Sequence, residues 1–104
     1  MSAIKVNKSN FEEIKNSQKP VLLDFYADWC GPCRMVGPII EEIANERDDI
    51  VVGKINVDEE EELAVKFGIE SIPTLIIVKG GEVVAKQIGY NAKAIVDSFI
   101  NKNI

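Results

Sequence analysis

The chain of 104 residues is 46% hydrophobic and 28% charged, with a net charge of −5 and two cysteines. This length suits a single core, so we expect residues 1–104 to form one domain. The acidic balance without a basic cluster gives no electrostatic basis for binding nucleic acid. No apolar run approaches the length that spans a membrane, and no histidine offers the commonest general base or metal ligand.

The beginning of the chain resembles no secretory signal, so we expect a cytoplasmic protein. A short strand is predicted over Ile4–Val6. Next comes a helix that a capping box of Ser9 and Glu12 would open and that stops before Pro20. The nearly continuous apolar run of Val21–Ala27 is typical of a strand that is buried on both faces.

The remainder of the chain continues this alternation and then ends on a hairpin. Its predicted elements are a helix from about Cys33 to Glu46, a strand over Val51–Val57, a helix over Glu59–Phe67, strands over Thr74–Val78 and Glu82–Ile88 around Gly80-Gly81, and a helix from about Ala92 to Asn101. Crossover connections make neighbouring strands parallel, whereas a hairpin makes them antiparallel. The sequence therefore predicts an α/β fold with a central mixed sheet of about five strands and about four helices on its two faces.

The most informative feature is the pair Cys30 and Cys33, separated by two residues at a strand-to-helix junction. The start of a helix offers unpaired N–H groups and a positive dipole end, and both stabilise a thiolate. We therefore expect Cys30 to have a depressed pKa and to be the nucleophile. Cys33, one turn later and less exposed, would attack a mixed disulfide formed at Cys30. Gly31 and Pro32 suit the first turn, because proline there has no N–H to leave unpaired.

Other interpretations of the two cysteines are weaker. A structural zinc site needs about four Cys or His ligands, and the chain holds only these two cysteines. A purely structural disulfide across so short a loop would stabilise the fold little and is unusual in the cytosol. Two unrelated buried thiols are the third alternative. A dithiol/disulfide redox pair is favoured because the motif lies between a strand and a helix.

The surroundings of the motif resemble the thioredoxin family. Cys30 and Cys33 lie in the run Trp29-Cys30-Gly31-Pro32-Cys33-Arg34, which follows Asp24-Phe25-Tyr26-Ala27 and precedes Pro38. The resemblance extends along the chain through Lys54-Ile55-Asn56-Val57-Asp58, Gly68-Ile69, Ile72-Pro73-Thr74, Gly80-Gly81-Glu82 and Gly89. It implies a thioredoxin fold and protein-disulfide reductase activity.

The resemblance also suggests roles for two charged residues within apolar strands. Asp24 could be an acid that turns to solvent at a strand edge, whereas burial would raise its pKa and let it exchange protons near neutral pH. In the family the matching acid lies beneath the inner cysteine, so Asp24 would assist deprotonation of Cys33 through water. Lys54 could be an ordinary solvated lysine; by resemblance it lies near Asp24. Desolvation and this cation act in opposite directions on the pKa of Asp24, and the sequence leaves the net direction open.

Substrate contacts are likewise implied by the resemblance. The residues that would contact a substrate surround the two cysteines. They are Trp29, Gly31, Pro32, Ile72, Pro73 and Gly89. Trp29 would give a flat apolar shelf beside Cys30, although a tryptophan is as often core filling. Pro73 would be a cis proline facing the cysteines, with Ile72 offering backbone hydrogen bonds to an extended target segment, although Pro73 could be only the start of a strand.

The chain departs from the family pattern beside these expected substrate contacts, at Glu70-Ser71 and Tyr90. The departures leave the chemistry untouched and bear on which partners fit. We therefore expect a general protein-disulfide reductase that acts on disulfide-containing target proteins and is restored by a separate thioredoxin reductase. No dinucleotide motif or metal-ligand set is present, so no cofactor or metal is expected, and we expect a monomer. The alternatives are a dedicated redox partner of one enzyme system and a redox-independent binding module.

Overall fold

The structure is a computed structural model, and it describes residues 2–104. The elements alternate strand and helix until the hairpin, as predicted. They are β1 (Ile4–Lys5), α1 (Phe11–Lys15), β2 (Val21–Tyr26), α2 (Gly31–Glu46), β3 (Val51–Asn56), α3 (Glu61–Lys66), β4 (Thr74–Lys79), β5 (Glu82–Ile88) and α4 (Lys93–Asn103).

The strands form one five-stranded sheet in the order β1-β3-β2-β4-β5. The pairs β1–β3 and β2–β3 are parallel, whereas β2–β4 and β4–β5 are antiparallel. The predicted mixed sheet is therefore confirmed. Gly80 and Gly81, at the hairpin, have φ angles of 62° and 81°. A two-residue turn that follows the twist of both strands needs such positive φ values, and only glycine adopts them without steric cost.

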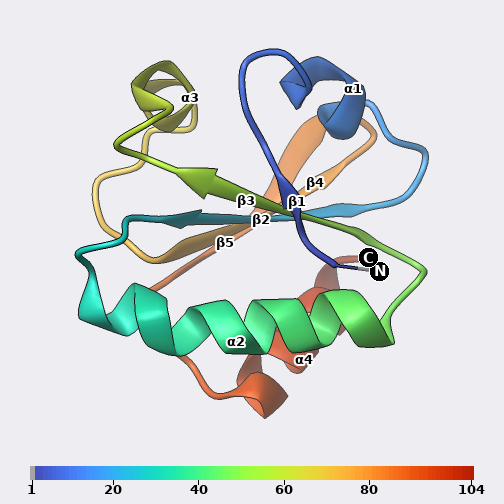
Figure 1. The fold of residues 1–104 in the computed structure, drawn as a ribbon. Coiled ribbons are helices and arrows are strands. Elements are labelled where there is room, and N and C mark those ends of the chain that lie inside the picture. Colours follow the sequence, from blue (N-terminus) through green and yellow to red (C-terminus); the bar gives the residue numbers. More distant parts are fainter. Residues whose placement is uncertain (1) are drawn as a thin grey trace.

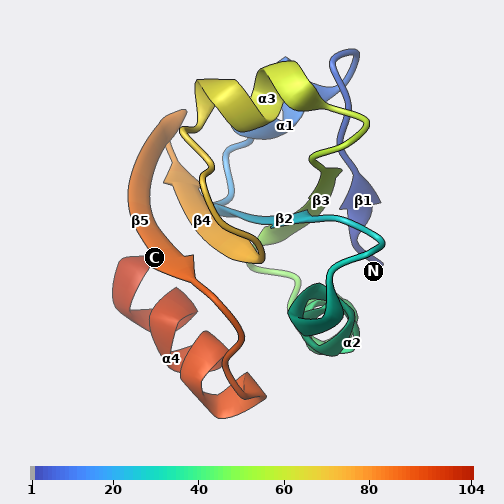
Figure 2. The ribbon, with the colours of Figure 1, turned by 90° about the vertical axis from the view of Figure 1, so that its left-hand side faces the viewer.

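Helices cover both faces of the sheet, as Figure 1 and the turned view of Figure 2 show. Helices α1 and α3 lie on one face and α2 and α4 on the other. The buried side chains fall into two large apolar clusters, one on each face. The α2/α4 cluster contains Leu22 and Ile40, and the α1/α3 cluster contains Leu23 and Phe25. Successive residues of β2 thus serve opposite faces, as the alternation of a strand requires.

The arrangement of the sheet places three chain segments at one edge. Strands β2 and β3 are parallel, so their carboxyl ends lie together, and α2 begins just beyond β2 (Figure 1). Strand β4 runs the other way beside β2, with Thr74 opposite Phe25. The segment that leads into β4 therefore reaches the same edge as the start of α2.

One local prediction is wrong. Ser9 and Glu12 do not form a capping box, because α1 begins at Phe11 with Asn10 in the N-cap position and no side-chain capping bond. The side chain of Asn7 instead accepts hydrogen bonds from the backbone N–H groups of Ser9 and Asn10, at 2.8 and 3.1 Å. The asparagine upstream holds the turn, so the N-terminus of the helix is shifted by one residue.

Candidate active site

Cys30 and Cys33 stand at the beginning of α2 and are joined in a disulfide, with their Cα atoms 5.2 Å apart. Cys30 is the N-cap residue, and Gly31 and Pro32 form the first turn, so the helix begins two residues earlier than predicted. The backbone N–H of Cys33 donates a hydrogen bond to the Cys30 sulfur, at 3.3 Å. The sulfur thus occupies the place where a capping oxygen normally accepts an orphan N–H. The first turn of α2 carries no acidic residue to oppose negative charge there.

The two sulfurs have different surroundings. Both cysteines are buried, with exposed fractions of 5% and 4%, so burial does not separate them as strongly as predicted. Their neighbours do. The Cys30 sulfur lies 3.8 Å from the carbonyl oxygen of Ile72, whereas Cys33 lines a cleft of about 600 Å³ that reaches Lys54. Cys30 therefore adjoins the segment before β4, and Cys33 adjoins the space between α2 and the sheet.

Pro73 lies in that segment and follows a cis peptide bond from Ile72, as predicted. The proline is buried, and its carbonyl oxygen accepts a hydrogen bond from the N–H of Gly89 at 2.8 Å. Thr74 donates its hydroxyl to the carbonyl of Ser71 at 2.6 Å, which closes the turn on the other side. The N–H of Ile72 has no hydrogen-bond partner among the described residues.

Trp29 lies beside Cys30 and is 69% exposed, so it is not core filling. Its indole N–H donates to a carboxylate oxygen of Asp58 at 2.8 Å. Asp58 was missed as a site residue, because the acidic run after β3 indicates the first turn of a helix, whereas α3 begins only at Glu61. No spacing rule would have paired an aspartate with a tryptophan 29 residues away.

A shallow groove of about 210 Å³ runs past Trp29 toward Ile72. It is lined by Trp29, Val57, Ala64, Ile69, Glu70, Ser71 and Ile72. Two of the three residues that depart from the family pattern, Glu70 and Ser71, therefore border it as predicted. Tyr90 is exposed and follows Gly89, but it does not line this groove.

Asp24 lies in the central strand β2, and only 1% of it is exposed. Neither carboxylate oxygen has a hydrogen-bond partner among the described residues. Burial raises the pKa of the Asp24 carboxyl to about 7, and the positive charge of Lys54 acts in the opposite direction. Desolvation therefore outweighs the neighbouring cation, which is the comparison that the sequence left open.

Lys54 lies opposite Asp24 on the neighbouring strand β3. Its side-chain nitrogen is 4.8 Å from the centre of the Tyr26 ring, a cation–π distance. Among residues 2–104 no ion pair within 4.0 Å joins it to Asp24. Lys54 is half-buried and lines the Cys33 cleft, so it is not a solvated surface lysine.

The described residues contain no group of three or more His, Cys, Asp or Glu side chains placed to hold a metal ion. In the same part of the chain, no helix has both the length and the apolar character to cross a membrane.

The sequence of the chain is similar to those of known proteins. The thioredoxin family model matches residues 2–102, nearly the whole chain. The chain belongs to the thioredoxin family. It is 44% identical to a thioredoxin of Haemophilus influenzae, over 95% of this chain and 94% of that one.

Two further thioredoxin relatives extend the comparison. A mutant thioredoxin from Halobacterium salinarum has a similar structure, with a TM-score of 0.90 and 35% identity over 98% of this chain and 90% of that one. A bifunctional thioredoxin reductase/thioredoxin of Mycobacterium leprae is 48% identical over 83% of this chain and 19% of that protein. Together with the bridged Cys30–Cys33 pair, the family match identifies the chain as a thiol–disulfide oxidoreductase that reduces protein disulfides.

Proposed function

We propose that Cys30 is the attacking thiol and Cys33 the resolving thiol of this reductase. The observation that carries the assignment is the hydrogen bond from the N–H of Cys33 to the Cys30 sulfur, at the N-terminus of α2. In the dithiol form, that N–H and the helix dipole stabilise negative charge on Cys30 in particular. Pro32 has no N–H of its own, and apart from its chain neighbours and the nearby backbone of its own helix nothing lies within 4 Å of where a Cβ of Gly31 would be.

The electrons balance in two exchanges. The Cys30 thiolate attacks one sulfur of a target disulfide, forms a mixed disulfide, and releases the other target sulfur as a thiolate. Cys33, deprotonated, then attacks the Cys30 sulfur, forms the Cys30–Cys33 bond, and releases the second target thiolate. The target gains two electrons and two protons, and the protein loses the same number.

Asp24 is suited to accept the proton of Cys33 in the second exchange. A pKa of about 7 means that the carboxyl can both take up and release a proton near neutral pH. Cys33 and Lys54 line the same cleft, and Lys54 lies opposite Asp24 on β3, so we propose that water in this cleft relays the proton from the thiol towards Asp24. Lys54 is a positioning residue, because its charge keeps the pKa of Asp24 from rising further.

The target segment is proposed to lie along the groove between Trp29 and Ile72. Trp29 offers an exposed apolar surface held by Asp58, and Ile72 offers a free N–H and a carbonyl for a short stretch of strand-like pairing. Pro73 and Gly89, which are joined by a backbone hydrogen bond, do not line this groove, and we propose that they form a wall for the target segment beyond Ile72. Glycine at position 89, with φ of 92° and nothing within 4 Å of a Cβ, keeps this wall low.

Regeneration requires a reductant, and we propose a thioredoxin reductase for this role. The supporting observation is the Mycobacterium leprae relative, whose name joins the two activities in one protein. A reducing compartment such as the cytoplasm would keep the dithiol form populated. We propose a monomer, since the Cys30–Cys33 disulfide closes within one chain and the exchange therefore needs no second copy.

The function is tested with the protein first reduced to the dithiol and then mixed with insulin. Reduction of the insulin disulfides, with one Cys30–Cys33 disulfide formed per disulfide reduced, is the expected result. Absence of turnover would rule out the general reductase.

A Cys33→Ser variant tests the order of the two thiols, because it should trap target proteins in a mixed disulfide at Cys30. Capture of many targets supports a general reductase, whereas one dominant target would support the dedicated partner. Nothing in the described residues favours a redox-independent binding module. Full biological activity of a double Cys30→Ser, Cys33→Ser variant would nevertheless establish one.

A further inference from the structure

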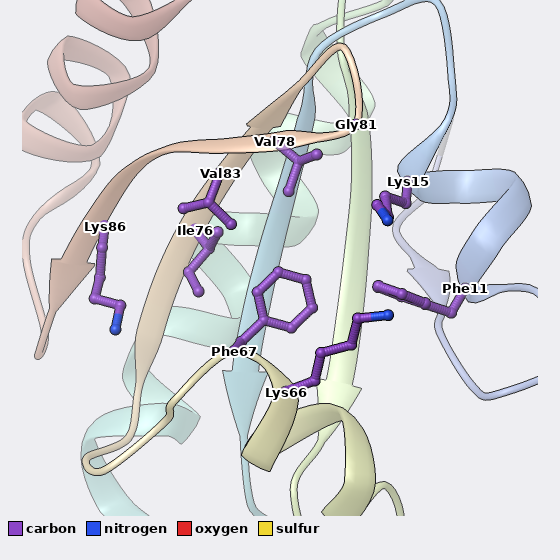
Figure 3. A pocket seen from close by; sticks show the side chains of 9 residues that line it. All are labelled: Phe11, Lys15, Lys66, Phe67, Ile76, Val78, Gly81, Val83 and Lys86. Atoms are coloured by element: carbon purple, nitrogen blue, oxygen red, sulfur yellow. The ribbon is translucent and has the colours of Figure 1, made fainter.

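A second cavity lies on the opposite face of the sheet from the Cys33 cleft, between α1, α3 and the β4–β5 hairpin (Figure 3). Its volume is about 400 Å³, within the range of about 300–1,000 Å³ that small-ligand sites occupy. None of the residues assigned to disulfide reduction lines it. The cavity is therefore independent of the chemistry at α2.

The floor and walls of the cavity are apolar. They are formed by Phe11, Phe67, Ile76, Val78 and Val83, with Gly81 at the hairpin. The rings of Phe11 and Phe67 meet edge to face, with their centres 5.6 Å apart, so the aromatic wall is held in a fixed geometry. Figure 3 shows Ile76 and Val78 on β4 and Val83 on β5 facing this wall. An apolar body of ligand size would lie between the ring pair and the two strands.

Every charged side chain that lines the cavity is positive: Lys15, Lys66 and Lys86. This contrasts with the whole chain, in which acids outnumber bases 17 to 12. Lys86 has no partner among the described residues. The nitrogen of Lys66 lies 4.9 Å from the centre of the Phe11 ring, at the boundary between the apolar wall and the cationic rim.

One acid competes for these cations from outside the cavity. Glu12 lies 3.9 Å from Lys15 and 3.7 Å from Lys66, and its side chain is largely exposed. Such long, solvated ion pairs contribute about 0–1 kcal/mol, so an anion seated inside the cavity can displace them. No acid lines the cavity itself.

We propose that this cavity binds a small amphiphilic carboxylate, with the apolar body against Phe11, Phe67 and the hairpin and the carboxylate among the rim lysines. The apolar floor selects a hydrocarbon body and the cationic rim selects a negative head. A neutral or cationic molecule of the same shape lacks the second interaction.

Octanoate is the probe, added to the full-length protein while backbone amide signals are followed by NMR. We expect saturable shifts in α1, α3, β4 and β5. Octanol should bind several-fold more weakly, and octylammonium at least about tenfold more weakly, because the rim repels it. Equal affinity for octanoate and octylammonium, or shifts confined to Trp29 and Ile72, would overturn the proposal.

Two matched variants distinguish binding in the cavity from a general effect of negative charge on the surface. Val83→Glu places a negative charge on the wall and should weaken octanoate binding about tenfold. Val84→Glu is the control, because Val84 is similarly exposed (47% against 51%) and does not line the cavity. Equal weakening by the two variants would contradict the site.

A variant that is expected to tighten octanoate binding excludes loss of folding as the explanation for weaker binding in the others. Glu12→Gln releases Lys15 and Lys66 and should tighten octanoate binding about twofold, whereas Lys86→Gln should weaken it about threefold. Insulin reduction should be unchanged in all of these variants, so failure of this proposal is distinguishable from failure of the reductase assignment. Unaltered affinity in both Glu12→Gln and Lys86→Gln would show that no carboxylate is held by the rim.

Discussion

The two faces of the sheet are built from the same strands and differ in what they bury. On the α1/α3 face, β2 contributes Leu23 and Phe25 to an apolar cluster. On the α2/α4 face, the same strand contributes Leu22 and then Asp24, whose carboxylate oxygens have no hydrogen-bond partner among the described residues. One face thus satisfies the ordinary rule for a core. The other breaks it at the charged Asp24 and also at the neutral Gln87, whose buried Oε1 has no hydrogen-bond partner among the described residues either.

The destabilising, unpaired carboxylate of Asp24 lies on the same face of the sheet as the helix that carries the two cysteines. Asp24 lies on the face that α2 covers, and its neighbour on β3, Lys54, lines the cleft that Cys33 of α2 also lines. A polar side chain in an apolar core is destabilising unless it is paired, so such a residue persists where function requires it. Among residues 2–104, the α1/α3 face buries no charged side chain, and its apolar cluster supplies stability instead. Chemistry and stability are thus divided between the two faces.

The largest effect is expected for Cys30→Ser. Hydroxyl oxygen does not replace the thiolate as nucleophile, so turnover with insulin should fall by at least about a thousandfold. The free energy of unfolding of the variant should stay within about 0.5 kcal/mol of that of the reduced wild type, since the substitution is nearly isosteric. Residual turnover above a few per cent would mean that Cys30 is not the attacking thiol.

Asp24→Asn should show the largest change in stability. The pKa of this carboxyl is about 7 in the folded protein and about 4 in the unfolded chain. Between these values the folded state holds the proton and the unfolded state does not, so the free energy of unfolding falls as pH rises from about 4 to about 7. Three pH units at about 1.4 kcal/mol each give a penalty on the order of 4 kcal/mol above pH 7.

The Asp24→Asn variant lacks this pH-dependent loss of stability, because an amide does not titrate in this range. Urea unfolding should show Asp24→Asn to be more stable than the wild type at pH 8, by as much as about 4 kcal/mol, with the advantage disappearing near pH 4. Asp48→Asn, at an exposed acid, is the control and should leave the pH dependence unchanged. Parallel stability curves for Asp24→Asn and the wild type would show that Asp24 is charged throughout. Turnover of Asp24→Asn should fall at the step in which Cys33 attacks.

Much of this division was predictable from the sequence. The apolar run of β2 with one acid predicts a central strand, and the two cysteines before a helical pattern predict the site at its end. The family resemblance predicts a cis proline at Pro73, and the bond from Ile72 to Pro73 is cis. These features are predictable because each is local or follows from the order of strands and helices.

The remaining features depend on distances between segments far apart in the chain. Whether burial or Lys54 dominates the pKa of Asp24 is a balance of two opposing effects, which requires the geometry of β2 against β3. The bond from Trp29 to Asp58 joins two loops and follows no periodicity. The wrong prediction of a capping box at Ser9 has a local cause instead, because the side chain of Asn7 accepts a competing hydrogen bond from the backbone.

Gly53→Ala tests the packing of the α1/α3 face. A Cβ at this position would lie 2.6 Å from a methyl group of Val6 and 3.1 Å from one of Leu23, both buried side chains. Such overpacking should lower the free energy of unfolding by about 1–3 kcal/mol. Gly37→Ala, in α2, meets only the Lys54 nitrogen at 3.9 Å and should be neutral or stabilising by up to about 1 kcal/mol. Equal effects in chemical denaturation would mean that β3 shifts to admit the methyl group.

The smallest effect is expected for Phe67→Leu, which removes the central ring of the aromatic cluster on the α1/α3 face. Phe67 contacts the rings of Phe11 and Phe25, at centre distances of 5.6 and 5.3 Å. Each such pair contributes about 0.5–1.5 kcal/mol beyond its buried area, and leucine retains most of the apolar volume. We expect the free energy of unfolding to fall by about 1–2 kcal/mol, with insulin turnover unchanged. A fall in turnover at constant stability would show that this face acts on the thiols, so that chemistry and stability are not divided between the two faces.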